Sequence, residues 1–215
     1  MDYGPLIKND KEEGYSVKFV LVGDSEVGKT NIVNLYVDHK NEPEYTKTLA
    51  TEYKNIIFTL NEDTFKLKIV DTSGDKKFLD FIKDAYENAN FVIIVFDVTN
   101  KNSFLSVNKW IKHCRSSKNE NIKFILVGNK NDLEEERKIS QYEASSFAEK
   151  NGMIYYDISA FKEEDVRRIF DEAFNSFYEG FIKSEDKSNF RRSRIDSVYS
   201  IQLNRKVKKK ISYCC

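Results

Sequence analysis

The chain has 215 residues, of which 40% are apolar and 33% charged, and its 35 basic residues are balanced by 35 acidic ones. This length suits one compact domain with some additional chain, and 13% aromatic residues with only eight Gly and two Pro exclude a wholly disordered, collagen-like or linker-dominated protein. The longest strongly apolar run, 91–96, is far shorter than the roughly 20 residues of a membrane-spanning helix. Residues 1–14 lack the apolar region of a signal peptide, and three Cys cannot form a disulfide framework, so we expect a cytosolic protein.

Strand-like segments alternate with helical ones from about residue 16 onward, which predicts an α/β fold with a six-stranded, mostly parallel sheet and helices on both faces. The expected strands are 17–22, 55–60, 64–70, 91–96, 122–127 and 153–156. Only Asn61, Glu62 and Asp63 separate the second strand from the third, so these two are expected to pair as one antiparallel hairpin. The fourth and fifth strands are almost continuously apolar, as central strands of a parallel sheet are.

Two helices are predicted by apolar residues at three- and four-residue spacing. Their stripes are Phe104, Val107, Ile111 and Cys114 in the first helix and Val166, Ile169, Phe170, Ala173, Phe174, Phe177 and Phe181 in the second. We interpret both stripes as packing faces rather than ligand contacts. A shorter helical stretch is expected at 31–38, and beyond Ser184 the periodicity fades into Ser, Arg and Lys, which predicts a flexible tail.

The strongest motif is a loop with the pattern G-x-x-x-x-G-K-T at residues 23–30. It follows an apolar strand and precedes a helical stretch, the arrangement in which successive backbone N–H groups at a helix N-terminus form a nest for phosphate. Lys29 is expected to bridge the β- and γ-phosphates of a nucleotide, and the Thr30 hydroxyl to bind Mg²⁺. The candidate phosphate-binding residues are Ser25, Glu26, Val27, Gly28, Lys29, Thr30 and Asn31. The alternative is a glycine-bounded turn that binds no ligand.

A second motif, Asn129-Lys130-Asn131-Asp132, indicates which base is bound. It follows the apolar strand 122–127 and so lies at the C-terminal edge of the predicted sheet, where ligands of open α/β sheets bind. The Asp132 carboxylate only accepts hydrogen bonds and therefore matches the adjacent N1–H and N2–H₂ donors of guanine, whereas adenine offers an acceptor at N1. Asn129 is expected to brace the loop, and the stem of Lys130 to lie along the purine face. Alone, such a tetrapeptide is also common in polar turns.

Together these motifs resemble those of the small Ras-like GTPases, and within them the Rab family, over about residues 16–183. Residues 71–74 (DTSG) are similar to the family's D-T-A-G, and 96–100 (FDVTN) to the Y-D-V-T-N common in Rabs. Ser159 and Ala160 resemble the S-A loop that contacts guanine. The resemblance implies a P-loop NTPase fold for the GTPase domain, 16–183, between an N-terminal extension, 1–15, and a basic tail, 184–215.

The resemblance also implies which residues bind Mg²⁺ and sense the γ-phosphate. Thr48 lies where the family has the switch I threonine, whose hydroxyl binds Mg²⁺ and whose N–H holds the γ-phosphate. Asp71 is expected to hold Mg²⁺ through water, and the Gly74 N–H to meet the γ-phosphate, so both switches are tethered only while that phosphate is present. The implied metal-binding residues are Thr30, Thr48 and Asp71, and the implied catalytic residues are Lys29, Thr48, Gly74 and Asp75.

The sequence departs from the family in the residues that govern turnover and nucleotide release. Asp75 stands where the family usually has the Gln that orients the attacking water, which predicts slow intrinsic hydrolysis, although Rab-activating proteins of the TBC type insert both an Arg and a Gln in trans. Glu26 replaces the usual Gly, adding negative charge and a side chain where the backbone favours positive φ. Asn41 lies where an aromatic residue usually stacks on guanine. Glu26 and Asn41 predict faster nucleotide dissociation, unless Glu26 points outward and matters little.

A further departure concerns the effectors. The aromatic triad that Rab effectors commonly read aligns here with Tyr53, Val70 and Ala85, and only the first is aromatic. Because less aromatic area is available as an anchor, we expect a different effector set from that of well-known Rabs.

The balanced charge hides a basic C-terminal segment, because residues 184–215 carry a net charge of +6. The segment ends in Cys214 and Cys215, which match the double-cysteine end that is geranylgeranylated in Rabs. Two lipid chains, or one chain and a basic patch, give stable attachment to an acidic membrane. The alternatives are a solvated tail with unmodified Cys and, less favoured, a nuclear-import or nucleic-acid role.

These observations predict a Rab-like GTPase that binds GTP or GDP with Mg²⁺, hydrolyses GTP and recruits effectors in vesicle trafficking. Its expected partners are an exchange factor, a GTPase-activating protein, a GDP-dissociation inhibitor or escort protein and effectors, with no nucleic acid. We expect it at the cytoplasmic face of an intracellular membrane, cycling with the cytosol. The alternative function is a nucleotide-dependent membrane tether with negligible intrinsic hydrolysis, which Asp75, Glu26 and Asn41 favour. An ATP-using P-loop kinase is disfavoured by residues 129–132 and by the single short domain.

Overall fold

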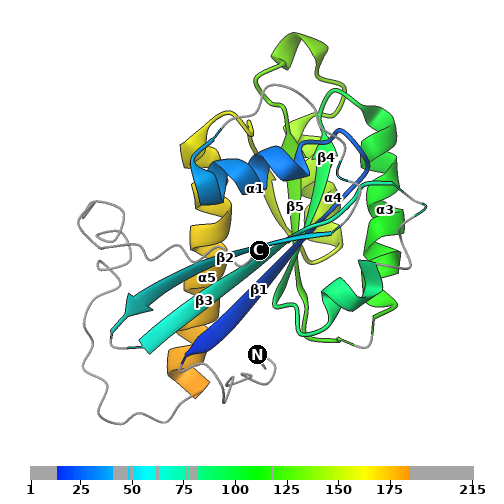
Figure 1. Ribbon diagram of the computed structural model, residues 1–215. Coiled ribbons are helices and arrows are strands. Elements are labelled where there is room, and N and C mark those ends of the chain that lie inside the picture. The colour runs from blue at the N-terminus through cyan, green and yellow to red at the C-terminus, as the bar shows by residue number, and fades with distance from the viewer. Residues whose placement is uncertain are drawn as a thin grey trace.

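The computed structural model describes residues 14–40, 48, 51–61, 63–75, 77, 82–117 and 119–184, which form a six-stranded sheet flanked by helices (Figure 1). The strands are β1 (Tyr15–Val22), β2 (Glu52–Leu60), β3 (Asp63–Asp71), β4 (Phe91–Asp97), β5 (Lys123–Asn129) and β6 (Ile154–Asp157). All six predicted strands are confirmed, with ends that differ from the prediction by at most three residues.

The strands lie in the order β2-β3-β1-β4-β5-β6, and every neighbouring pair is parallel except β2 and β3. The predicted hairpin is therefore confirmed, with Phe58 opposite Phe65. Asn61 turns the chain between these two strands with φ of 50°, a left-handed conformation that Asn adopts more readily than most residues.

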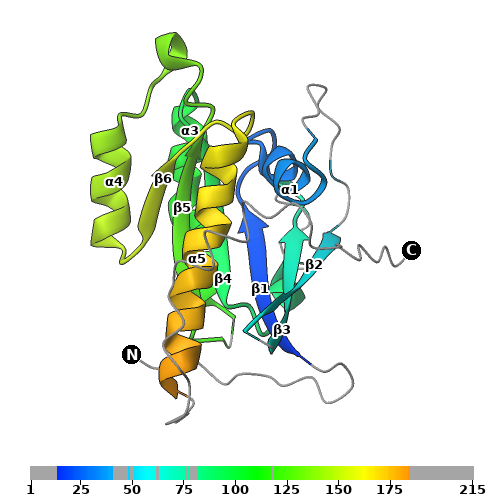
Figure 2. The same cartoon turned by 90° about the vertical axis from the view of Figure 1, so that its left-hand side faces the viewer.

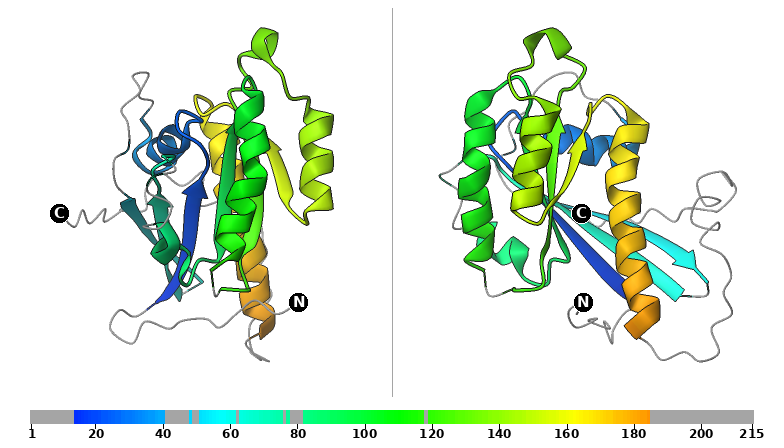
Figure 3. Two further views of the ribbon diagram at one scale, coloured as in Figure 1. Left: turned by 90° about the vertical axis from the view of Figure 1, so that its right-hand side faces the viewer. Right: turned by 180° about the vertical axis from the view of Figure 1, so that it is seen from behind.

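Helices cover both faces of the sheet, as predicted. Helices α1 (Lys29–Asp38) and α5 (Glu163–Ser184) pack on one face, and α3 (Lys101–Arg115) and α4 (Gln141–Lys150) on the other. Figure 2 shows α5 in front of the sheet, and the left panel of Figure 3 shows α3 in front of the opposite face. Two short 3₁₀ helices, η2 (Lys83–Tyr86) and η3 (Glu134–Glu136), complete the described elements.

Aromatic side chains fix α1 and α5 to the sheet. Phe65 of β3 meets Phe174 and Tyr178 of α5 edge-on, with ring centroids 5.3 and 5.6 Å apart. Tyr36 of α1 stacks on Phe170 of α5 at 4.1 Å. Burial of each large apolar side chain contributes about 1.5–3 kcal/mol, so this core holds α1, and the loop that precedes it, in one position.

Helix α4 was not predicted by apolar periodicity, because the side chains it buries are small. Ala144 and Ala148 belong to the apolar core on the α3 and α4 face of the sheet, and Phe147 is only partly buried. A capping signal was present, since the Ser140 side chain accepts a hydrogen bond from the Glu143 backbone N–H at 3.1 Å. The pattern S-x-x-E at 140–143 marks the start of α4.

Parts of the predicted domain layout lie outside the described residues. These are residues 1–13 of the N-terminal extension and 185–215 of the basic tail, including Cys214 and Cys215. Within the described ranges, no helix combines the length and apolar character needed to cross a bilayer.

The parallel strands β1, β3, β4, β5 and β6 all end at the same edge of the sheet. The loops after them therefore meet there, and they include both predicted motifs. This edge is where ligands of open α/β sheets bind.

Candidate functional site

The loop between β1 and α1 has the backbone conformation that a nest for an anion needs. Glu26 and Gly28 have positive φ, 69° and 95°, and α1 begins at Lys29. The first N–H groups of α1 have no acceptor within the helix, so this end favours an anion. Gly28 is required by space as well as by φ, because a Cβ there would collide with the amide nitrogen of Asn129.

Lys29 is buried, with 6% of its surface exposed, and is held over this loop. Its Nζ donates to the backbone carbonyls of Gly23 and Asp24 at 2.9 and 2.8 Å. Burial lowers the pKa of Lys29 to about 8, while the carboxylates of Asp71 and Asp24 act in the opposite direction. The ammonium group is therefore prepositioned in a dry site, where its interaction with an anion is strong.

Three oxygen-bearing side chains meet beside Lys29. Thr30 Oγ1 donates to Asp71 Oδ2 at 2.6 Å and lies 2.9 Å from Thr48 Oγ1. Because Thr30 has a single hydroxyl proton, the hydroxyl of Thr48 must be the donor in the second contact. These residues come from α1, from the segment before β2 and from the end of β3, as a shared ligand would require.

The donor set fits Mg²⁺. Asp71 is buried, and among the described residues its Oδ1 has no hydrogen-bond partner. Burial raises the pKa of Asp71, opposed by the hydrogen bond from Thr30 and by the charge of Lys29. A buried carboxylate with an unused oxygen, next to two hydroxyl groups, offers the hard oxygen ligands that Mg²⁺ prefers.

The loop after β3 brings Gly74 against the phosphate loop. A Cβ on Gly74 would lie 2.5 and 2.6 Å from the carbonyl carbon and oxygen of Asp24, so no larger residue fits this approach. The Asp75 backbone N–H donates to Ser73 Oγ at 3.3 Å, and its Oδ1 accepts from the Lys77 backbone N–H at 3.1 Å. The side chain of Asp75 is thus engaged with its own loop.

Asn129 joins the two predicted motifs. Its Nδ2 donates to the carbonyl of Val27 at 2.8 Å, and its Oδ1 accepts from the backbone N–H of Ala160 at 2.8 Å. One buried side chain therefore links the loops after β1, β5 and β6, as the predicted bracing role requires. Ser159 is also buried, and its backbone N–H donates to Asp165 at 3.2 Å.

Lys130 and Asp132 lie in the same loop as Asn129 but are more accessible. Lys130 has φ of 69°, and its Nζ lies 2.7 Å from Asp97 Oδ2. Asp97 is held in turn by the backbone N–H and hydroxyl of Thr99, at 2.8 and 2.7 Å. This fixes the direction of the Lys130 stem, while the exposed Asp132 is open to a ligand.

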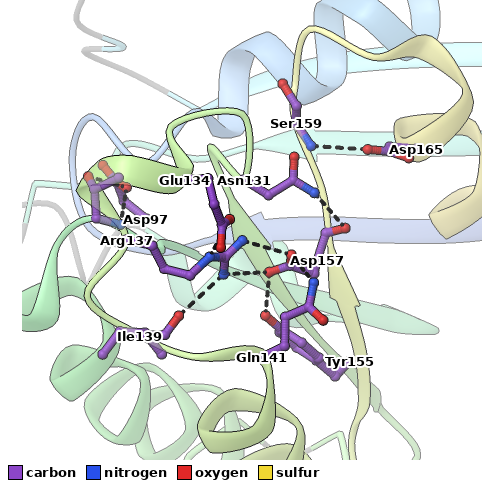
Figure 4. A network of polar contacts seen from close by, with 11 residues as sticks. Asp97, Asn131, Glu134, Arg137, Ile139, Gln141, Tyr155, Asp157, Ser159 and Asp165 are labelled. Atoms are coloured by element: carbon purple, nitrogen blue, oxygen red, sulfur yellow. Dashed lines mark hydrogen bonds and ion pairs between the residues drawn. The ribbon is translucent and has the colours of Figure 1, made fainter.

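A buried ion pair lies beside the loop that contains Asn129, Lys130 and Asp132 (Figure 4). Arg137 Nη2 lies 3.0 Å from Asp157 Oδ2, and both side chains are about nine-tenths buried. Tyr155 and Gln141 also donate to the Asp157 carboxylate, each at 2.8 Å. Burial acts to raise the pKa of Asp157, but these hydrogen bonds and the Arg137 charge outweigh it and hold the pKa below its usual range.

The ion pair is connected to the base motif through the backbone of Asp157. The Asn131 side chain donates to the carbonyl of Asp157 at 3.1 Å, and the Asn131 backbone N–H donates to that of Ile158 at 3.0 Å. The third position of the tetrapeptide thus ties this loop to the one containing Ser159.

Sequence reasoning missed three groups at this site: Asp97, the Arg137–Asp157 pair, and Asp24, whose carboxylate accepts from the indole N–H of Trp110 on α3. Asp97 lies within the FDVTN segment, and the resemblance of that segment to Rabs assigns no role to its Asp. The other contacts join residues far apart in the chain, and no local pattern marks them.

Three other sequence predictions concern the guanine-stacking position, the effector triad and Cys114. Asn41 lies outside the described residues. Of the effector triad, Tyr53 is 63% exposed, whereas Val70 and Ala85 are buried. Cys114 is buried in the core, as the apolar stripe predicts.

Comparison with known proteins gives consistent matches. A family model described as the Ras family matches residues 18–179. Ras-related protein Rab-2B of Dictyostelium discoideum is 36% identical over 181 residues, which is 83% of this chain and 88% of that protein. Ras-related proteins Rab-11B and Rab-4 of the same organism are 34% and 32% identical, over 81% and 73% of this chain and 79% and 76% of their own.

Proposed function

The chain belongs to the Ras family of small GTPases and is similar within it to Rab proteins, and we propose that it is a guanine-nucleotide switch acting in vesicle trafficking. The observation that carries the proposal is the Asn129 bridge, because it brings the phosphate loop, the base motif and the Ser159–Ala160 loop to one place. A single nucleotide would span these three loops.

Each part of the nucleotide has a counterpart in the chain. The backbone of residues 25–30 and the Lys29 ammonium bind the phosphates. Asp132 accepts from the N1–H and N2–H₂ groups of guanine and repels adenine, while Lys130, aligned by Asp97, covers the purine face. Guanine specificity therefore rests on Asp132, and affinity for phosphate on Lys29.

Hydrolysis would proceed by in-line attack of water on the γ-phosphate, giving GDP and phosphate. Lys29 stabilises the charge that develops on the phosphate oxygens. Thr30, Thr48 and Asp71 would hold Mg²⁺, which supplies further positive charge to the phosphates. Gly74, whose backbone lies against the phosphate loop, would bring its N–H within reach of the γ-phosphate.

The bound nucleotide provides the first test. Protein purified in Mg²⁺ and then denatured should release GDP or GTP, identified by chromatography against standards. Release of adenine nucleotides alone would refute the proposal.

A second candidate function is a nucleotide-dependent tether with negligible intrinsic turnover. The position of Asp75 favours it, because the carboxylate accepts from the N–H of Lys77, lacks the N–H donor of a Gln side chain and adds negative charge beside the polyphosphate. Single-turnover hydrolysis of GTP should be about ten times or more faster in Asp75→Gln than in the wild type, in line with at least 1.4 kcal/mol of transition-state stabilisation. Equal rates would show that Asp75 does not limit turnover.

The partners follow from the same proposal. Phosphate release, measured with and without a Rab-activating domain, separates a regulated switch from a tether. An exchange factor, effectors and a GDP-dissociation inhibitor or escort protein complete the expected set. We place the protein at the cytoplasmic face of an intracellular membrane, attached through lipid on Cys214 and Cys215, and mass spectrometry of the C-terminal peptide tests this attachment.

A further inference from the structure

Trp110, the single tryptophan of the chain, makes a polar contact with the phosphate loop. It lies on α3 and is 3% exposed, and its indole N–H donates to Asp24 Oδ1 at 2.8 Å. The two residues are 86 positions apart, so the bond joins the α3 layer to the loop after β1. A hydrogen bond from a neutral donor to a carboxylate is charge-assisted, and it is therefore stronger than a hydrogen bond between two neutral groups.

The peptide of Asp24 is also the point where two other parts of the site meet. Its carbonyl accepts one of the two hydrogen bonds that hold Lys29, at 2.8 Å. The Gly74 backbone approaches the same carbonyl so closely that a Cβ there would lie 2.6 Å from its oxygen. A shift of Asp24 would therefore move the carbonyl oxygen that accepts from Lys29, and the same carbonyl is the group against which Gly74 packs.

The indole itself is rigidly placed. Trp110 lies within the core that covers this face of the sheet, and its ring meets His113 edge-on at 6.4 Å. His113 Nδ1 lies 3.0 Å from the hydroxyl of Tyr86, a fully buried residue of η2. Packing therefore fixes the position of the indole N–H, and the hydrogen bond to this N–H fixes the position of the Asp24 side chain.

We propose that Trp110 is a positioning residue for the phosphate site: its bond to Asp24 fixes the peptide that supports Lys29 and seats Gly74. This inference rests on the proposed nucleotide-binding function. Because the contact between Trp110 and Asp24 lies beside the phosphate loop, it strengthens binding of the nucleotide's phosphates and does not contribute to the choice of base.

Four variants test this role. Asp24→Ala and Trp110→Phe each remove the bond, Asp24→Asn keeps an acceptor oxygen, and the double variant Asp24→Ala/Trp110→Phe tests additivity. The matched control is Glu172→Ala, which removes a carboxylate that accepts from the buried Tyr156 hydroxyl at 2.7 Å between β6 and α5. Asp24→Ala leaves the aromatic core intact, so the test does not depend on the folding of Trp110→Phe.

Dissociation of GDP in Mg²⁺ is the first measurement. It should accelerate about tenfold in Asp24→Ala and in Trp110→Phe, corresponding to about 1.4 kcal/mol, with little further change in the double variant. Asp24→Asn should restore the rate to within about threefold of the wild type, and Glu172→Ala should match the wild type. The preference for GDP over ADP should stay constant throughout, whereas general loosening of the site would reduce it.

The single indole N–H resonance in the NMR spectrum gives a direct second measurement. It should shift strongly in Asp24→Ala, remain near its wild-type position in Asp24→Asn, and move when GDP is exchanged for a non-hydrolysable GTP analogue. GDP dissociation from Asp24→Ala within twofold of the wild type, or an Asn variant that behaves like Ala, would overturn this inference while leaving the proposed function intact. A wild type that binds no guanine nucleotide would overturn the proposed function, and the inference with it.

Discussion

Replacing Arg137 by Met should destabilise the fold and loosen the base-binding loops. The substitution keeps much of the aliphatic volume but leaves the Asp157 carboxylate, nine-tenths buried, without its cation. Removal of one partner from a buried ion pair costs about 3–5 kcal/mol. The hydrogen bonds from Tyr155 and Gln141 remain, so we expect the lower end, about 3 kcal/mol. In a domain of this size that loss lowers the Tm by roughly 6–12 °C.

The pH dependence identifies the cause of this loss. In the wild type the pKa of Asp157 is lowered, so its stabilising contribution is complete above the unfolded carboxyl pKa of about 3.9 and declines as the pH falls below it. In Arg137→Met the hydrogen bond and the charge by which Arg137 lowers that pKa are lost, so the pKa of Asp157 rises relative to the wild type and protonation relieves the penalty of burying an unpaired carboxylate. The difference in stability between the two proteins should therefore be largest near neutral pH and shrink toward pH 4.

Thermal unfolding of both proteins at equal GDP and Mg²⁺ concentrations provides the assay, since bound ligand itself adds stability. The control is Arg167→Met, the same substitution in a partly exposed pair with Glu163 at 3.5 Å, expected to cost below about 1 kcal/mol. Equal losses in the two variants, or a loss at Arg137 that does not vary with pH, would refute the reasoning.

Two further predictions concern nucleotide release. Glu26→Gly removes a side chain from a backbone with φ of 69°, together with a negative charge near the phosphates, and should slow GDP dissociation about fivefold, or about 1 kcal/mol; an unchanged rate would mean that Glu26 is well tolerated. Chelation of Mg²⁺ by EDTA should accelerate GDP release from the wild type by about tenfold or more. Asp71→Ala should already release GDP rapidly and show little response to EDTA, and a full response would contradict the assigned donor set.

The fold was largely predictable because its signals are local. The apolar runs of β4 and β5 are continuous, the hairpin turn is short, and the α5 stripe extends over several turns. Helix α4 was not predicted, because Ala144 and Ala148 are small and its apolar periodicity is therefore weak. Apolar periodicity predicts a helix only where its buried face is large, and the local signal for α4 is the capping pattern at 140–143 instead.

The candidate site was predictable where a motif is contiguous and not where a contact spans the chain. The phosphate loop and the base motif are each a run of neighbouring residues, and the structure brings them together through Asn129. The contacts of Trp110 with Asp24 and of Arg137 with Asp157 depend on how α3 and the segment before α4 pack. No spacing rule connects such residues, so they appear only in three dimensions.

Direct titration of the nucleotide-free protein with GDP and with ADP, both in Mg²⁺, tests the central claim. Because Asp132 matches the donors of guanine and meets an acceptor on adenine, GDP should bind about 10⁴-fold or more tighter than ADP. Asp132→Ala should lose most of this preference, while affinity for the phosphates remains. Comparable affinities for GDP and ADP in the wild type would contradict the assignment of a guanine-nucleotide switch.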